Sequence, residues 1–255
     1  MTPHYRPPEK LLEELGITEP EDIDLEAIAY YCGATVVEDD LRGCEARLVG
    51  HGDKAFITLK RGGYDRRKRF SLGHELGHWM HDRGQATFRC GSKDFDTWRG
   101  ESPEVRANTY AANLLLPRSM FAPRAKRCDI TLDAASDLAD TFQTSLTATA
   151  IRLVEFCERP AIAAYVTRAG ITLVRRHRLV PFGVKLRDTV STDSMAFRTL
   201  TDGADRGATD LEASVWFTDS HAAWHPVQEH SKRIRPNLVL TLLWWPDEGH
   251  LLKYL

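Results

Sequence analysis

The residues best suited to chemistry in this sequence form one short run, His74-Glu75-Leu76-Gly77-His78. Side chains four positions apart lie on one face of a helix, so His74 and His78 can direct two imidazoles at one metal ion. Neutral imidazole is a common ligand of Zn²⁺, and this ion lowers the pKa of a water molecule at its open position towards about 7. Glu75 projects from the adjacent position and can accept a proton from that water as a general base. The run therefore predicts a hydrolytic zinc site, although the same pattern also occurs by chance in unrelated proteins.

The residues around this run favour a helix. Apolar or small residues recur at spacings of three and four, which predicts a buried stripe formed by Phe70, Gly73, Gly77 and Met80. A glycine costs about 1 kcal/mol against alanine in a helix, so two glycines within one turn indicate close packing or room beside the metal. Gly84 is suited to end the helix. The simpler alternative is an amphipathic helix whose histidines are only polar surface.

A catalytic zinc needs a third protein ligand beside an open position for water. Downstream, Ser102 is a suitable N-cap and Pro103 a suitable first residue of a second helix. Glu104 then lies in the first turn and is the predicted third ligand, with Asn108 one turn further on to orient a liganding histidine. Glu104 could instead serve only to complement the helix dipole. The rival ligands are acidic residues of the preceding loop-like stretch, Asp94, Asp96 and Glu101.

Three segments taken together resemble the ImmA/IrrE family of zinc metallopeptidases. They are Arg69–His78, Glu104–Ala111 and Leu114–Pro117. The likeness covers roughly the first 120 residues well and is vague beyond about residue 160. The motif around His74 and His78 and the motif that begins at Glu104 are separated by a distance similar to that in the family. The two motifs together are more specific than either motif alone.

The resemblance implies a gluzincin-like site. His74, His78 and Glu104 would bind Zn²⁺, and Glu75 would be the catalytic base. It also implies the family's role, a zinc metallo-endopeptidase that cleaves a partner helix-turn-helix transcriptional repressor and so triggers a stress or mobile-element response.

Length and composition agree with a cytoplasmic enzyme. A chain of 255 residues can form one large domain or two small ones, and no apolar run is long enough to cross a bilayer. The N-terminus lacks the apolar region of a secretory signal. The five cysteines are scattered and odd in number, which is typical of free thiols in a reducing compartment. The net charge of −2 argues against a protein that coats nucleic acid.

The chain as a whole predicts an α+β fold in three parts. Residues 1–130 are expected to form a zincin-like metallopeptidase domain, with a small antiparallel sheet beside the active-site helices. Its predicted strands are residues 34–38, 46–49 and 55–59, short β-rich runs separated by Gly or Asp. The last of these is a candidate for holding an extended substrate by strand addition, and a purely structural strand is the alternative.

Residues 131–159 predict a helical segment whose break at residues 142–145 resembles a helix-turn-helix. Its second helix offers only Arg152 as a basic group, so a helical hairpin used for packing is favoured over DNA binding. Residues 160–255 predict a small sheet-based α/β domain, comparable by analogy to the GAF-like regulatory domains of some relatives. Its role is expected to be regulation or substrate selection, with coverage of apolar surface as the alternative. No metal is assigned to the histidines that fall here, His177, His221, His225 and His230.

The sequence is compatible with two classes of function. The first is an active zinc endopeptidase acting on a partner repressor. The second is a non-catalytic zinc-containing transcriptional regulator or a ligand-sensing binding protein. Glu75 favours the enzyme, because a metal that only stabilises a fold has no need of a general base.

Overall fold

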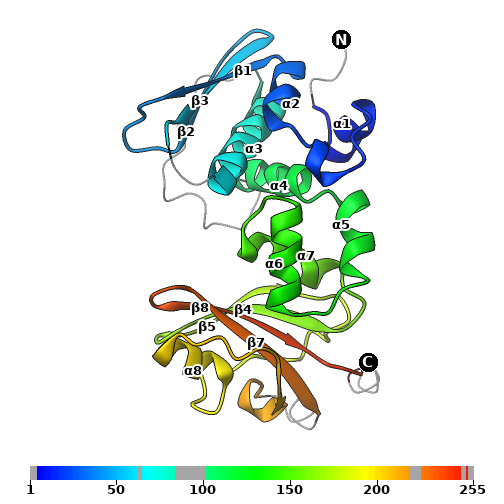
Figure 1. Ribbon diagram of the computed structural model, residues 1–255, viewed down its shortest axis with the longest axis vertical. Helices are drawn as coiled ribbons and strands as arrows, with labels where there is room; N and C mark the ends of the chain where they lie inside the picture. Colours follow the sequence, from blue (N-terminus) through cyan, green and yellow to red (C-terminus); the bar gives the residue numbers. More distant parts are fainter. Residues whose placement is uncertain (1–4, 63–64, 84–101, 219–224, 248–250, 252–255) are drawn as a thin grey trace. The chain divides into compact units, whose positions relative to one another are not determined.

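The computed structural model describes residues 5–62, 65–83, 102–218, 225–247 and 251 of the chain (Figure 1). These residues form helices and two sheets, so the predicted α+β class is confirmed. The chain divides into two compact units, one of Met1–Met120 with Asp140–Ser145 and one of Phe121–Ala139 with Leu146–Leu255. The domain boundaries expected near residues 130 and 159 stay predictions. Among the described helices, none combines the length and apolar character needed to span a membrane.

The first unit begins with three short helical elements, α1 (Pro8–Glu14), the 3₁₀ helix η1 (Pro20–Asp22) and α2 (Leu25–Tyr31). Helix α2 begins where the sequence predicts, because the carboxylate of Asp24 accepts hydrogen bonds from the backbone N–H groups of residues 26 and 27 at 3.0 and 3.1 Å. Leu25 and Ile28 then face the interior of the unit.

A three-stranded sheet follows, with β1 (Ala34–Asp39), β2 (Ala46–His51) and β3 (Lys54–Lys60) in the order β1-β3-β2. Strands β2 and β3 form an antiparallel hairpin, but β1 pairs with β3 in parallel. The prediction of a purely antiparallel sheet is therefore wrong. The chain reverses direction after β1 and again after β2, so β3 runs parallel to β1, and β3 rather than β2 lies beside it. Since β3 is the central strand, residues 55–59 have no open edge, and the strand addition predicted for them is also wrong.

Two helices carry the residues of the predicted zinc site, α3 (Asp65–Asp82) and α4 (Pro103–Leu115). Helix α4 starts at Pro103 as expected, because the backbone N–H of Val105 donates to Ser102 Oγ at 3.3 Å. Helix α5 (Arg118–Ala125), which the sequence analysis missed, contains Pro123 and follows directly.

Helices α3 and α4 approach each other closely where α3 carries glycine. A Cβ atom at Gly77 would lie 2.9 Å from the Cα and O atoms of Ala107, and one at Gly73 would lie 3.3 Å from Ala111 Cβ. The prediction that the two glycines mark close packing is confirmed. Their cost in helix propensity is offset by a helix–helix approach that, at Gly77, leaves no room for a larger residue.

The second unit is built on a five-stranded antiparallel sheet of order β5-β4-β8-β7-β6. Its strands are β4 (Ala161–Thr167), β5 (Gly170–Arg176), β6 (Thr209–Glu212), β7 (Pro226–Arg235) and β8 (Leu238–Trp244). The helical elements of this region are α6 (Leu132–Thr141), α7 (Leu146–Phe156), α8 (Met195–Asp202) and the 3₁₀ helix η3 (Ala213–Val215). Helices α7 and α8 cover opposite faces of the sheet (Figure 1), so the inner strands β4 and β8 are apolar along their length.

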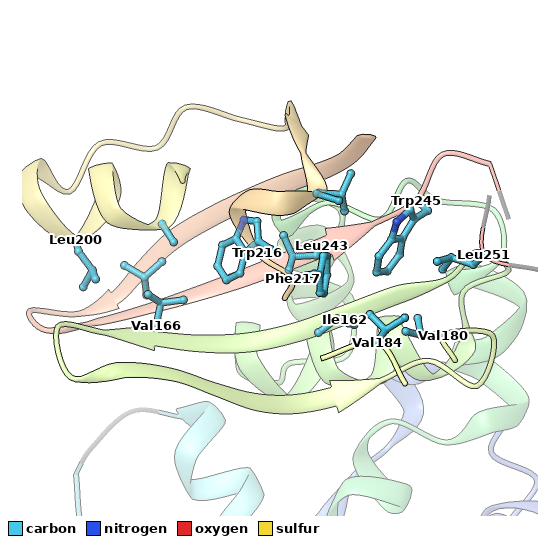
Figure 2. Close-up of a cluster of buried hydrophobic side chains, with 14 residues drawn as sticks. Ile162, Val166, Val180, Val184, Leu200, Trp216, Phe217, Leu243, Trp245 and Leu251 are labelled. Atoms are coloured by element: carbon cyan, nitrogen blue, oxygen red, sulfur yellow. The ribbon is translucent and has the colours of Figure 1, made fainter. Parts of the chain in front are cut away.

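The core of the second unit lies between the sheet, α8 and the loop segments around Val180 and Trp216 (Figure 2). The rings of Phe217 and Trp245 stack with their centroids 5.2 Å apart. Both Trp216 and Phe217 are buried, and they follow a single 3₁₀ turn, although an apolar run such as residues 215–217 is also typical of a strand. These residues are apolar because the side chains of Trp216 and Phe217 enter the core from one turn.

Glu229 of β7 is a fully buried carboxylate that joins three parts of this unit, β7, α8 and the turn that holds Trp216. It accepts hydrogen bonds from the backbone N–H groups of Met195 and Ala196, from Trp216 Nε1 and from Ser231 Oγ. Burial raises the pKa of Glu229 above its ordinary value, and the four donors oppose that shift. Glu229 therefore fixes the start of α8 on the sheet.

Replacing Glu229 by alanine should destabilise the protein by about 3 kcal/mol or more, because several buried donors lose their acceptor at once. Urea unfolding followed by tryptophan fluorescence measures the change. The matched control is Glu212→Ala at the exposed end of β6, which should shift stability by about 0.5 kcal/mol or less. Equal effects of the two substitutions would contradict the role given to Glu229.

Candidate metal centre

Three potential metal ligands converge from α3 and α4. The Nε2 atoms of His74 and His78, one helical turn apart, are separated by 3.1 Å. Glu104, in the first turn of α4, places its carboxylate oxygens 3.2 Å from His74 Nε2 and 3.3 Å from His78 Nε2. Both histidines are buried, whereas the side chain of Glu104 is 25% exposed, so solvent reaches the group from the glutamate side.

The chemistry of this donor set fits a divalent ion. One potential ligand atom from each of the three residues lies within 4.8 Å of the other two. Two buried imidazole nitrogens that face each other and one carboxylate form a concentrated set of lone pairs, which a cation stabilises. Three protein ligands leave a fourth tetrahedral position open, as hydrolytic metal sites require.

Asn108 lies directly behind His74. Its Oδ1 atom is 2.8 Å from His74 Nδ1, and the residue is fully buried. An amide oxygen can only accept, so in this contact Nδ1 carries the proton and the lone pair of Nε2 points to the other ligands. The structure thus brings Asn108 to the histidine that it was expected to orient.

Asp82 lies behind His78 and was missed by the sequence analysis. Its Oδ2 atom is 3.5 Å from His78 Nδ1, and its Oδ1 atom accepts from Arg106 at 3.0 Å. The carboxylate is only 5% exposed. Because Asp82 follows His78 by four residues, as His78 follows His74, helical spacing alone could have indicated it. The Asp82–Arg106 ion pair also connects the end of α3 to the first two turns of α4, which hold Glu104.

Glu75 follows His74 on α3 and is almost completely buried. Burial of a carboxylate is costly, so such a residue beside metal-ligand side chains is typical of a functional group. The rival ligands Asp94, Asp96 and Glu101 lie outside the described residues, so Glu104 is the only one of the four that the structure places.

Burial lowers the pKa of His78 below its ordinary value, and the neighbouring His74 lowers it further. Glu104 and Asp82 act in the opposite direction, since their charges favour the protonated ring. A lowered pKa keeps the imidazole neutral at physiological pH. The ring is therefore in the state that a metal ion requires.

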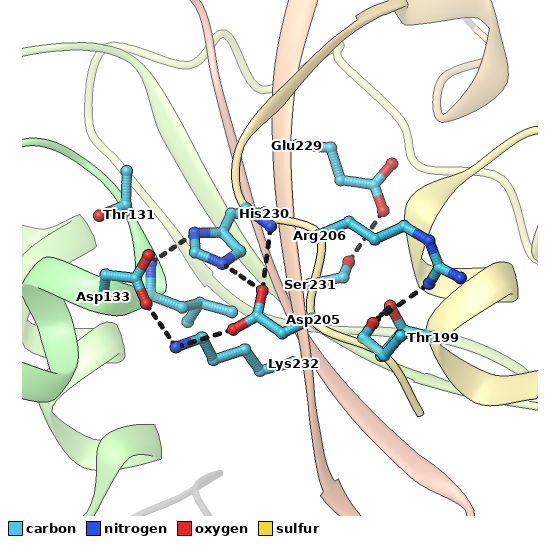
Figure 3. A network of polar contacts seen from close by, with 12 residues as sticks. Thr131, Asp133, Thr199, Asp205, Arg206, Glu229, His230, Ser231 and Lys232 are labelled. Atoms are coloured by element: carbon cyan, nitrogen blue, oxygen red, sulfur yellow. Dashed lines mark hydrogen bonds and ion pairs between the residues drawn. The ribbon is translucent and has the colours of Figure 1, made fainter. Parts of the chain in front are cut away.

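A second group of potential ligands, Asp133, Asp205 and His230, does not fit a metal ion (Figure 3). His230 Nδ1 accepts the backbone N–H of Leu132 at 3.1 Å, so Nε2 carries the proton and donates to Asp205 at 3.2 Å. Neither nitrogen then has a lone pair to offer. The ammonium of Lys232 contacts both carboxylates and already supplies the positive charge. This group is a polar network that joins β7 to the start of α6.

The region that carries the first of these groups is similar to a known protein family. The sequence model of the peptidase M78 family, described as an IrrE N-terminal-like domain, matches residues 33–154, which include α3 and α4. Among solved structures, a Mycobacterium tuberculosis transcriptional regulator is similar, with a TM-score of 0.56 and 16% identity over 97% of this chain and 90% of that chain. At this identity the likeness shows a shared fold. No curated protein matches the chain.

Replacing Asp82 by asparagine should weaken metal binding about 10- to 100-fold while the fold is retained, because His78 loses the charged partner that holds its ring. Competition with a chromophoric chelator measures the affinity. Asp53→Asn is the matched control, since Asp53 also pairs with an arginine, Arg83, but is 83% exposed. Equal affinities for parent and Asp82→Asn would show that Asp82 does not act through His78.

The metal-free protein should lose stability as the pH falls below about 6.5, the ordinary pKa of histidine. Because folding lowers the pKa of His78, the unfolded chain binds more protons in this range, and acid favours unfolding. Thermal midpoints at about pH 7.5 and 5.5 test this, with saturating metal as the comparison. Burial also lowers the pKa of His81 and of His177, so His78→Gln should reduce the pH dependence without abolishing it. An undiminished slope in that variant would exclude His78 as a source.

Proposed function

Since the chain belongs to the peptidase M78 family through its IrrE N-terminal-like domain at residues 33–154, we propose that it is a zinc-dependent endopeptidase. The observation that carries the proposal is the convergence of His74, His78 and Glu104 on one point. Two imidazoles, one carboxylate and an open position form a ligand set that zinc uses in hydrolytic enzymes. The contacts of Asn108 and Asp82 behind the histidines support the same reading.

The proposed roles of the residues follow from their chemistry. A bound zinc ion would supply Lewis acidity, which polarises the scissile carbonyl and acidifies water. Glu75 accepts a proton from the attacking water and delivers it to the departing amide nitrogen. Asn108 and Asp82 hold His74 and His78 in fixed orientations, so that the geometry does not have to be formed at the moment of reaction.

The proposed substrate is a helix-turn-helix transcriptional repressor, cleaved in the cytoplasm to trigger a stress or mobile-element response. The resemblance to the ImmA/IrrE family supports this role. An extended stretch of substrate cannot pair with β3, because β1 and β2 occupy both of its sides. Within the described sheet, the outer edges of β1 and β2 are the places where a peptide could add as a strand. Residues 160–255 are proposed to regulate this activity or to select the substrate.

A second function remains a candidate, a non-catalytic zinc-containing transcriptional regulator or ligand-sensing protein. The printed name of the similar Mycobacterium tuberculosis protein, a transcriptional regulator, favours it. The buried Glu75 favours the peptidase, because a metal that only stabilises the fold needs no adjacent carboxylate.

Glu75→Gln separates the two functions. The amide keeps the size of the side chain but cannot accept the proton, so cleavage of the helix-turn-helix repressor encoded beside this protein should fall by at least about a hundredfold. Zinc content and thermal stability should remain those of the parent. The control is Glu13→Gln on the exposed face of α1, which should cleave normally.

Undiminished cleavage by Glu75→Gln would remove the assigned role of this residue. If the parent protein binds zinc but cleaves no repressor, either with or without chelator, the regulator is favoured.

A further inference from the structure

Positive charge is concentrated in one segment of the second unit. Residues 159–187 contain seven arginines and lysines and no aspartate or glutamate, in a chain whose net charge is −2. The segment comprises the hairpin of β4 and β5 and the loop that follows it.

Three of these arginines make contacts within the unit. Arg176 donates to the carbonyl oxygens of Pro181 and Val184 at 2.7 and 2.6 Å, and Arg175 lies 3.9 Å from Glu155. Arg187 donates from Nε to Ser214 O at 2.8 Å, and its side chain is still exposed. The exposed basic residues, with Phe182, form what we call the basic surface: Arg168, Arg178, Lys185 and Arg187.

Phe182 is held out in solvent by the structure around it. The ring is 97% exposed at the tip of the loop. On either side of the tip, Val180 and Val184 are buried in the core (Figure 2), and Arg176 fixes the carbonyls of the same turn. The exposed ring is thus presented by an anchored loop. The guanidinium of Arg176 lies 6.0 Å from the centroid of the ring. One exposed aromatic residue is ordinary, but a ring on an anchored loop that also carries Arg178 and Lys185 is typical of a binding surface.

The basic groups extend along the edge strand β5. Val184 lies beside Arg176 at one end of β5, and the backbone N–H of Ile171 donates to Asp188 O at 3.0 Å at the other end. The segment 184–188 therefore runs beside β5 and, at about 3.4 Å per residue, spans at most about 14 Å. Lys185 and Arg187 are exposed and alternate with inward-facing residues, as in a strand.

We propose that the basic surface binds single-stranded nucleic acid. Separate positive groups along an extended segment match the spacing of backbone phosphates, and the face of Phe182 offers a stacking platform for an unpaired base. Bases within a duplex are stacked on one another and cannot lie on the ring, so a single strand is the better occupant. None of the basic surface belongs to the metal centre, so the inference does not depend on the proposed peptidase activity.

Fluorescence anisotropy with a labelled oligothymidylate of about 20 nucleotides tests the proposal on the full chain. Between about 50 and 200 mM salt, four phosphate contacts should give a slope of log K against log salt of about −3, and a duplex of equal length should bind more weakly. Phe182→Ala should weaken binding about tenfold without changing the slope. Lys185→Gln should reduce the slope by about 0.7.

The matched controls are Phe197→Ala and Arg198→Gln, which remove exposed residues of the same types from α8. Both should bind like the parent, and thermal melting verifies that all four variants are folded. The proposal is overturned if the parent does not bind the oligonucleotide, or if the control substitutions weaken binding as much as those at Phe182 and Lys185. Equal binding of the duplex, or binding only to vesicles of phosphatidylglycerol, would also overturn it.

Discussion

The close approach of α3 and α4 is the constraint on which the candidate metal centre depends. Gly77 places the backbone of α3 against Ala107, leaving no room for a Cβ atom. Only at this separation does Glu104, in the first turn of α4, reach both histidines of α3. Two glycines in one turn weaken an isolated helix, and the packing that they permit brings Glu104 to the two histidines. The two glycines thus lower the helix propensity of α3 at the point where the site requires close packing against α4.

Behind the three converging side chains, each histidine has a polar partner on its second nitrogen. Asn108 contacts His74 from α4, and Asp82 contacts His78 from within α3. The two partners differ in charge, and Asp82 is itself paired with Arg106 on the same helix as Glu104. Buried polar groups of this kind are stabilising only as a complete set. The site is therefore part of the packing of the two helices.

Local sequence signals predicted the parts of the fold that depend on neighbouring residues, and failed where distant pairing decides. The N-caps Asp24 and Ser102 and the spacing of His74 and His78 identify helix starts and faces directly. The parallel pairing of β1 with β3 depends on which strand docks beside β1, and no residue in either strand encodes that choice. Helix α8 has local end signals, because Ser194 Oγ accepts the backbone N–H of Phe197 and Gly203 ends the helix in the left-handed conformation. The sequence does not show that Glu229, more than thirty residues away, holds the start of α8 on the sheet. The spacing of Asp82 likewise follows from the sequence, but its contact with His78 is seen only in the fold.

We propose that Glu104 completes a zinc site with His74 and His78. Zinc titration of the parent, Glu104→Ala and Glu101→Ala, monitored by competition with a chromophoric chelator, measures the contribution of each carboxylate. We expect one zinc per chain in the parent and in Glu101→Ala, and an affinity at least about a hundredfold lower in Glu104→Ala, because a three-ligand site cannot lose a ligand without a large loss of binding. Parent-like affinity in Glu104→Ala, with the loss appearing in Glu101→Ala instead, would contradict it.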